Sequence, residues 1–271
     1  MKAWNVLYFD LVKLKKNDMI WGLLELSLLV RRAERCAPDA VYSEEDLKMV
    51  LEEIKDEELI VSQNFSAVVA EACHQKQRIY LSWVYDSPQA SLFMKEALYD
   101  TNRIFVFDKR QLTRMKGAGL PYIFYQPLAA NVTRLSGLVI EDEEIEKYRT
   151  DVLFVGGLYQ DARRTSYLNA LPEKMKTELE ELFAEKIGRW GLMRREFMPL
   201  SEDTRETMFK RLNQSHLEEY RFDSEYLLQT LILSREVSQR ERIEILSLLS
   251  RQCEVRCYTT GTPDERLLRV H

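Results

Sequence analysis

The side chains of this sequence best suited to chemistry are four polar groups that directly follow short apolar runs. Carboxylates, a carboxamide and a hydroxyl can all bind hydroxyl groups, and a carboxylate can also take a proton from one. Parallel strands end at a common edge of their sheet, and open α/β sheets bind ligands at that edge. We therefore expect one site there, formed by Asn64, Asp86, Ser87 and Asp108.

Asp86 is the strongest candidate for a catalytic role. As a general base it would take the proton of a reacting hydroxyl group. The alternative is a structural role, in which its carboxylate caps the following helix through the free backbone amides, with Pro88 in the first turn. Asn64 and Asp108 have the same two interpretations, ligand binding or helix capping.

A second candidate site contains Gly156 and Gly157, which follow the apolar run at 152–155. Glycines at a strand end let the backbone approach a diphosphate, and Arg163 or Arg164 could supply positive charge. The spacing lacks the full G-x-G-x-x-G pattern of dinucleotide-binding loops. The alternative is a tight turn followed by solvated arginines.

The elements that would position these groups alternate between strand and helix. Short runs rich in β-branched and aromatic residues, typical of strands buried on both faces, occur at 58–65, 79–85 and 102–108. Predicted helices occupy 66–74, 88–99 and 109–116. Such short connections fit βαβ units, so the sequence predicts an α/β fold with a Rossmann-like, doubly wound parallel sheet.

Five further elements complete this first domain. We expect strands at 4–9, 40–42 and 122–125. One helix is predicted to begin at Asn17 or Asp18 and to run to about Arg35. Another begins after Ser43, where carboxylates at 44–46 favour the positive end of a helix.

The chain then divides at an acidic stretch, residues 136–150, which we interpret as a linker or short helix. It separates a first domain at 1–135 from a second at 151–271. The second domain has predicted strands only at 152–155 and 254–260, with a large helical insertion between them. Two short strands cannot cover their own faces, so we expect a truncated second Rossmann-like domain and self-association through it.

Composition narrows the classes of function. The formal net charge of −5 disfavours nonspecific binding of nucleic acid, which depends on a basic excess. No signal peptide or long apolar span occurs, which indicates a soluble cytoplasmic protein with no membrane span. The cysteines form no metal motif and are interpreted as free thiols; they are Cys36, Cys73, Cys253 and Cys257.

Several segments, in order, resemble one family. These are VSQNF at 61–65, SWVYDSP at 82–88, IFVFDK at 104–109, QPLAA at 126–130 and DVLFVGGLY at 151–159. Together they resemble the N-terminal region of the CgeB-like glycosyltransferases, of the spore maturation protein type, which have two Rossmann-like domains in a GT-B arrangement. The resemblance covers about 58 to 160, and 239–260 also resembles the family's entry into its second domain.

The resemblance implies transfer of a sugar from a nucleotide-sugar donor to an unknown hydroxyl acceptor. The acceptor would lie at the edge of the first domain, with Asp86 as base if the reaction is inverting, and the donor mostly on the second. No metal or organic cofactor is implied. Since the sequence ends before the segment that carries most donor contacts, we expect this chain alone to be inactive. The rival interpretations are a non-catalytic binding or scaffold module with a helical partner surface and a different nucleotide-binding α/β regulator.

Overall fold

The computed structural model describes residues 4–11, 18–33, 42–55, 57, 59–187, 200–213, 228–259 and 267. The chain divides into two compact units. Unit 1 comprises 1–136 and 213–224, and unit 2 comprises 137–212 and 225–271. Each unit is described by itself.

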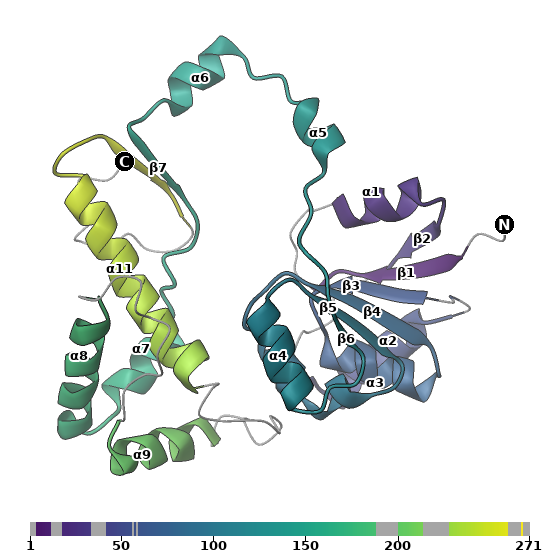
Figure 1. The fold of residues 1–271 in the computed structure, drawn as a ribbon, viewed down its shortest axis with the longest axis horizontal. Helices are drawn as coiled ribbons and strands as arrows, with labels where there is room; N and C mark the ends of the chain where they lie inside the picture. The colour runs from purple at the N-terminus through teal and green to yellow at the C-terminus, as the bar shows by residue number, and fades with distance from the viewer. Residues whose placement is uncertain are drawn as a thin grey trace. The chain divides into compact units, whose positions relative to one another are not determined.

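Unit 1 contains the alternating strands and helices that the sequence predicts (Figure 1). In chain order they are β1 (Asn5–Phe9), α1 (Asp18–Glu25), β2 (Leu29–Arg32), α2 (Glu44–Glu53), β3 (Leu59–Gln63), α3 (Ala67–Gln75), β4 (Ile79–Val84), the 3-10 helices η1 (Ala90–Phe93) and η2 (Lys95–Leu98), β5 (Asn102–Val106), α4 (Lys109–Gly117), β6 (Ile123–Tyr125) and α5 (Val132–Ser136).

The strands of unit 1 form one six-stranded sheet in the order β2-β1-β3-β4-β5-β6, and every pairing is parallel. Successive strand residues face opposite sides of the sheet. Val61 packs in a cluster with Ile20 and Leu23 of α1, whereas its neighbour Ser62 meets Tyr80 on the α3 side. Helices therefore cover both faces, and the predicted α/β parallel fold is confirmed.

The helix predicted to run to about Arg35 is shorter than expected. Helix α1 ends at Glu25, Ser27 has a positive φ of 57°, and the chain then forms β2. The backbone of Leu29 donates to Trp4 and that of Ala33 to Tyr8, so β2 satisfies the outer edge of β1. The unpaired backbone groups at the edge of β1 thus outweigh the helix propensity of this segment.

Two smaller predictions also need correction. Of the strand expected at 40–42, residues 40 and 41 lie outside the described residues, and Tyr42 precedes α2 without strand pairing. The helix expected at 88–99 is divided into η1 and η2 rather than being one α-helix. The helices expected after Ser66 and Asp108 do form, and each of these residues caps its helix through its side chain.

Unit 2 is mostly helical and contains one small sheet. Its elements are α6 (Asp142–Tyr148), β7 (Val152–Val155), α7 (Ala162–Asn169), α8 (Glu173–Ile187), α9 (Glu202–Asn213), the π-helix η4 (Leu228–Leu233), α11 (Ser234–Leu249) and β8 (Val255–Tyr258). Strands β7 and β8 pair in parallel. One face of this pair packs on α11 through Ile243 and Leu246.

Two expectations from composition can be compared with the structure. Cys73 is a buried free thiol, Cys253 and Cys257 are half-buried free thiols, and Cys36 lies outside the described residues. No helix within the described ranges has both the length and the apolar character that a membrane crossing requires.

A buried hydroxyl holds the start of α3 against the sheet. The Tyr80 side chain is fully buried, and its hydroxyl accepts a hydrogen bond from the Ser66 backbone amide at 2.9 Å. The Ser62 hydroxyl lies 2.6 Å from the same oxygen and also donates to the Asn64 carbonyl at 2.6 Å. Tyr80 thus supplies an acceptor for an amide that has no access to water.

Replacing Tyr80 by Phe should destabilise unit 1. The Ser66 amide would remain buried without its acceptor, which costs about 1–3 kcal/mol of unfolding free energy. Urea unfolding followed by tryptophan fluorescence measures the loss. The matched control is Tyr125→Phe, because the Tyr125 side chain is 43% exposed. Equal stability of Tyr80→Phe and the control would show that the hydroxyl has no such role.

Candidate functional site

The four polar side chains predicted to share an edge lie at the carboxyl ends of β3, β4 and β5, and they form two hydrogen-bonded pairs. The Asn64 carboxamide donates from Nδ2 to Oδ2 of Asp86 at 2.7 Å. The Ser87 hydroxyl donates to Oδ2 of Asp108 at 2.5 Å. The predicted juxtaposition is confirmed, although nothing in the geometry alone assigns these groups a ligand.

Asn64 is held in one orientation by the backbone of the next strand. Its side-chain Oδ1 accepts from the Tyr85 amide at 2.7 Å, so the Nδ2 group must face Asp86. The residue is 7% exposed and has a positive φ of 66°, a conformation that Asn adopts more readily than most residues. Asn64 therefore positions the Asp86 carboxylate from a buried place beneath it.

The alternative of helix capping applies to only one of these residues. Asp108 caps α4, since its Oδ1 accepts from the Arg110 amide at 2.7 Å. Asp86 does not cap η1, whose cap residue is Gln89. Asn64 does not cap α3, because Ser66 does. Asp86 is exposed, and its carboxylate faces solvent beside the Asn64 amide.

The charge of Asp108 is stabilised by its surroundings. Burial by itself would raise the pKa of this carboxyl group. Hydrogen bonds from the Ser87 hydroxyl and from the backbone amides of Arg110 and Gln111 outweigh burial, so the pKa lies below its usual value. Asp108 is thus ionised at neutral pH and acts as an acceptor for Ser87.

Two glutamines that the sequence did not single out complete this edge. Gln89, 4% exposed, accepts from the Phe65 amide at 3.0 Å and donates to the Phe65 carbonyl at 2.8 Å. Gln111, 2% exposed, accepts from the Gln89 amide at 3.0 Å and donates to the Asp86 carbonyl at 3.4 Å. The position of Gln111 in the sequence could have indicated this role. It lies in the first turn after the Asp108 cap, where side chains reach preceding backbone groups.

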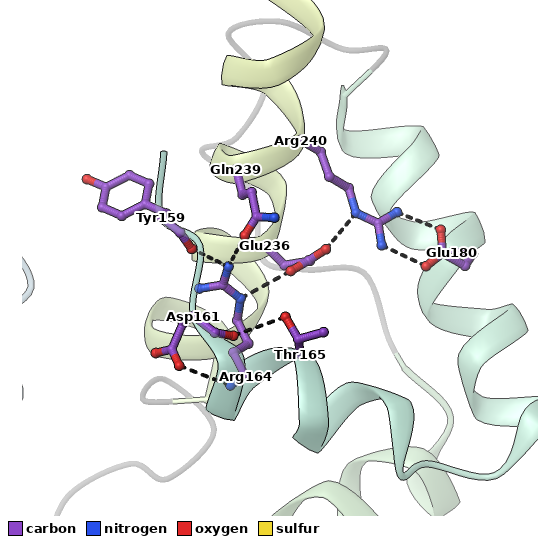
Figure 2. A network of polar contacts seen from close by, with 8 residues as sticks. All are labelled: Tyr159, Asp161, Arg164, Thr165, Glu180, Glu236, Gln239 and Arg240. Atoms are coloured by element: carbon purple, nitrogen blue, oxygen red, sulfur yellow. Dashed lines mark hydrogen bonds and ion pairs between the residues drawn. The ribbon is translucent and has the colours of Figure 1, made fainter. Parts of the chain in front are cut away.

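The second candidate site differs from the sequence prediction. Arg164 is 3% exposed, so it is neither a solvated arginine nor a charge open to a diphosphate. Its Nε lies 3.1 Å from the Glu236 carboxylate, and its Nη2 donates to the Tyr159 carbonyl and to the Gln239 side chain. Figure 2 shows Arg164 extending from α7 towards Glu236 and Gln239 of α11. The side chain of Arg163 lies outside the described residues.

The buried arginine belongs to a charge network that joins three helices (Figure 2). Glu236 also accepts from Nε of Arg240 at 2.8 Å. Arg240 in turn makes two hydrogen bonds to Glu180 of α8, at 2.5 and 2.7 Å, and its guanidinium lies 4.6 Å from the Phe183 ring centre. The hydrogen bonds from Arg240 lower the pKa of Glu180. The network links α7, α8 and α11.

Among the arginine side chains that the structure describes, Arg242 of α11 is the one that bonds to the glycine pair. Its Nη1 donates to the Gly157 carbonyl, and its guanidinium lies 4.1 Å from the Tyr159 ring centre. In the sequence, Arg242 is only one basic residue within QRERIE at 239–244. Local sequence could not reveal its contact with Gly157, because about 85 residues separate the two partners.

Comparisons with protein-family models, with curated proteins and with solved structures found no match to this chain. Within the described ranges, no group of three or more His, Cys, Asp or Glu side chains is placed to hold a metal ion.

The Asp108 carboxylate should make unit 1 more stable at neutral pH than in acid. Since its pKa is lower in the folded state, this stabilisation is present above the unfolded value near 3.8 and disappears as the pH falls through the folded value. Asp108→Asn keeps a capping side chain but has no charge. The stability difference between wild type and Asp108→Asn should therefore be present at pH 7 and vanish in strong acid.

Urea unfolding across this pH range measures the difference. The control is Asp100→Asn, which removes a carboxylate whose side chain is 69% exposed. A wild-type advantage over Asp108→Asn that stays constant down to the lowest pH would contradict the assignment.

Removing Glu236 should destabilise unit 2 strongly. The Arg164 guanidinium would remain buried without its counter-ion, which costs about 3–5 kcal/mol. Hydrogen exchange of the amides of α7 and α11 in Glu236→Ala measures this cost. Glu244→Ala, an exposed position on the same helix, should change stability by no more than about 0.5 kcal/mol. Equal protection in the two variants would exclude a stabilising role for the network.

Proposed function

We propose that this chain is the acceptor-side part of a GT-B-type glycosyltransferase, of the CgeB-like kind that its segments resemble, which transfers a sugar from a nucleotide-sugar to a hydroxyl group. The parallel Rossmann-like sheet of unit 1 is the architecture that such a part requires. The family itself, the donor and the acceptor are proposals.

The observation that carries the proposal is the Asp86 carboxylate. It is exposed at the carboxyl edge of the sheet, and Asn64, from the neighbouring strand end, holds it at 2.7 Å. An exposed, oriented carboxylate at this edge fits a general base for an acceptor hydroxyl. The Ser87 hydroxyl donates its proton to Asp108. Its oxygen lone pairs remain available to accept a hydrogen bond from the hydroxyl group of an acceptor molecule.

In unit 2, the strand end with Gly156 and Gly157 is the proposed place for the donor phosphates. Arg242 takes the role that the sequence prediction gave to Arg163 or Arg164, because its guanidinium lies against Gly157 and Tyr159. Arginine suits phosphate groups through its fixed set of donors. This assignment depends on the proposed reaction.

A binding module without catalytic activity is the second candidate. The specific observation in its favour is the outer face of the small sheet in unit 2, where Leu153 is 52%, Val155 71% and Tyr258 43% exposed. Exposed apolar residues at this density on a two-stranded sheet are typical of an interaction surface. Such a module would self-associate or bind a protein, and it would not bind nucleotide-sugars.

Saturation-transfer NMR of the wild-type chain with a panel of nucleotide-sugars separates the two candidates. The transferase proposal expects a signal from at least one donor. In a complete, catalytically active version of the protein, it also expects that Asp86→Asn lowers turnover with hydroxylated acceptors by at least about 100-fold, the contribution of a general base, while donor binding stays unchanged. Asp100→Asn is the control for loss of an exposed carboxylate.

Unchanged turnover in Asp86→Asn would remove Asp86 from catalysis. No saturation transfer from any donor, together with concentration-dependent association in sedimentation velocity, would instead support the binding module.

A further inference from the structure

In the loop that carries Asp86 and Ser87, the Asp86 carbonyl and the Gln89 amide do not bond to each other directly. In a hydrogen-bonded β-turn, the carbonyl of the first residue accepts directly from the amide of the fourth. Here those groups are the Asp86 carbonyl and the Gln89 amide. The Gln111 carboxamide lies between them, donating to the carbonyl at 3.4 Å and accepting from the amide at 3.0 Å.

We propose that Gln111 is a positioning residue for the candidate acceptor site, because its carboxamide bridges the Asp86 carbonyl and the Gln89 amide and so fixes the loop that presents Asp86 and Ser87. The proposal rests on the proposed function for its consequence, ligand binding at Asp86, but its structural content stands without it. Gln111 acts through the loop backbone and touches neither reactive side chain.

The position of Gln111 on α4 supports this role. It lies three residues after Asp108, and residues so spaced share one face of a helix. The first turn of α4 therefore makes three contacts with the loop: Asp108 accepts from the Ser87 hydroxyl, and Gln111 bonds to Asp86 and to Gln89. The loop geometry is thus set from α4.

Burial makes these contacts hard to replace by water. Gln111 is 2% exposed and Gln89 is 4% exposed. The Gln89 side chain is itself committed to both backbone groups of Phe65, so it cannot turn to satisfy its own amide. If Gln111 loses its carboxamide, the Gln89 amide remains buried without an acceptor, and the loop must move to find one.

Two variants separate the donor and acceptor functions of Gln111. Gln111→Met has a similar length and neither function. Gln111→Glu keeps an acceptor oxygen for the Gln89 amide but offers no donor to the Asp86 carbonyl. Thr113→Ala is the matched control, because this exposed side chain on α4 bonds only to the Lys109 carbonyl of its own helix, at 2.9 Å, among the described residues.

Amide hydrogen exchange and ¹H–¹⁵N spectra of the full chain test the proposal. In Gln111→Met the Gln89 amide should exchange at least about tenfold faster, and the Asp86 and Ser87 amide signals should shift, while those of β1 and β3 stay in place. Gln111→Glu should restore protection at Gln89 but leave the Asp86 signal shifted. Thr113→Ala should match wild type.

Three results would overturn the positioning role. The first is unchanged exchange and unchanged loop signals in Gln111→Met. The second is an equal loss of protection throughout unit 1, which would show a general structural role. The third is failure of Glu to restore protection at Gln89. These readouts need no ligand, so they remain decisive even if nucleotide-sugar binding fails and the proposed function is rejected.

Discussion

Backbone groups at the ends of parallel strands must find hydrogen-bond partners outside their own segment, and in unit 1 buried carboxamides supply them. Asn64 accepts from the Tyr85 amide, Gln89 pairs with both backbone groups of Phe65, and Gln111 joins the Asp86 carbonyl to the Gln89 amide. A carboxamide suits this task because it carries a donor and an acceptor without charge, so it can be buried at low cost once both are satisfied. The consequence is that only the loop residues between these anchors, Asp86 and Ser87, remain exposed.

In unit 2, a buried ion pair satisfies polar groups away from water. Arg164 brings a full positive charge into a site that is 3% exposed, and it is compensated by Glu236 together with neutral acceptors. Because a buried ion is tolerated only when its geometry and counter-charge are well satisfied, the network constrains how α7 and α11 pack. Arg242, which bonds to the Gly157 carbonyl, is instead half-buried and packs against Tyr159. The two arginines thus have different roles: Arg164 of α7 is buried in the charge network, whereas Arg242 of α11 bonds to Gly157.

The sequence allowed the sheet of unit 1 to be predicted well because its signal is local. Short β-branched and aromatic runs alternate with helical segments, and only a parallel arrangement suits such connections. The strand at 29–32 was missed for a physical reason. Ile20 to Val30 has the apolar character of a buried helix, and the hydrogen bonds that make Leu29 to Arg32 a strand come from the open edge of β1, which local sequence does not reveal.

The amino-acid sequence by itself determined that Asn64, Asp86, Ser87 and Asp108 would follow strands and meet at one edge, since strand ends and parallel pairing are encoded by nearby residues. It did not determine which of them cap helices, which glutamines hold the loop, or which arginine reaches Gly157. The cap is a local contact, between Asp108 and the Arg110 amide, but the other outcomes depend on partners 21 to 85 residues apart, whose contact arises only when strands and helices pack. Tertiary structure therefore decided that Arg164 is buried beside Glu236 and that Asp86 faces solvent, because burial and pairing of polar groups depend on the complete surroundings of each side chain rather than on its type.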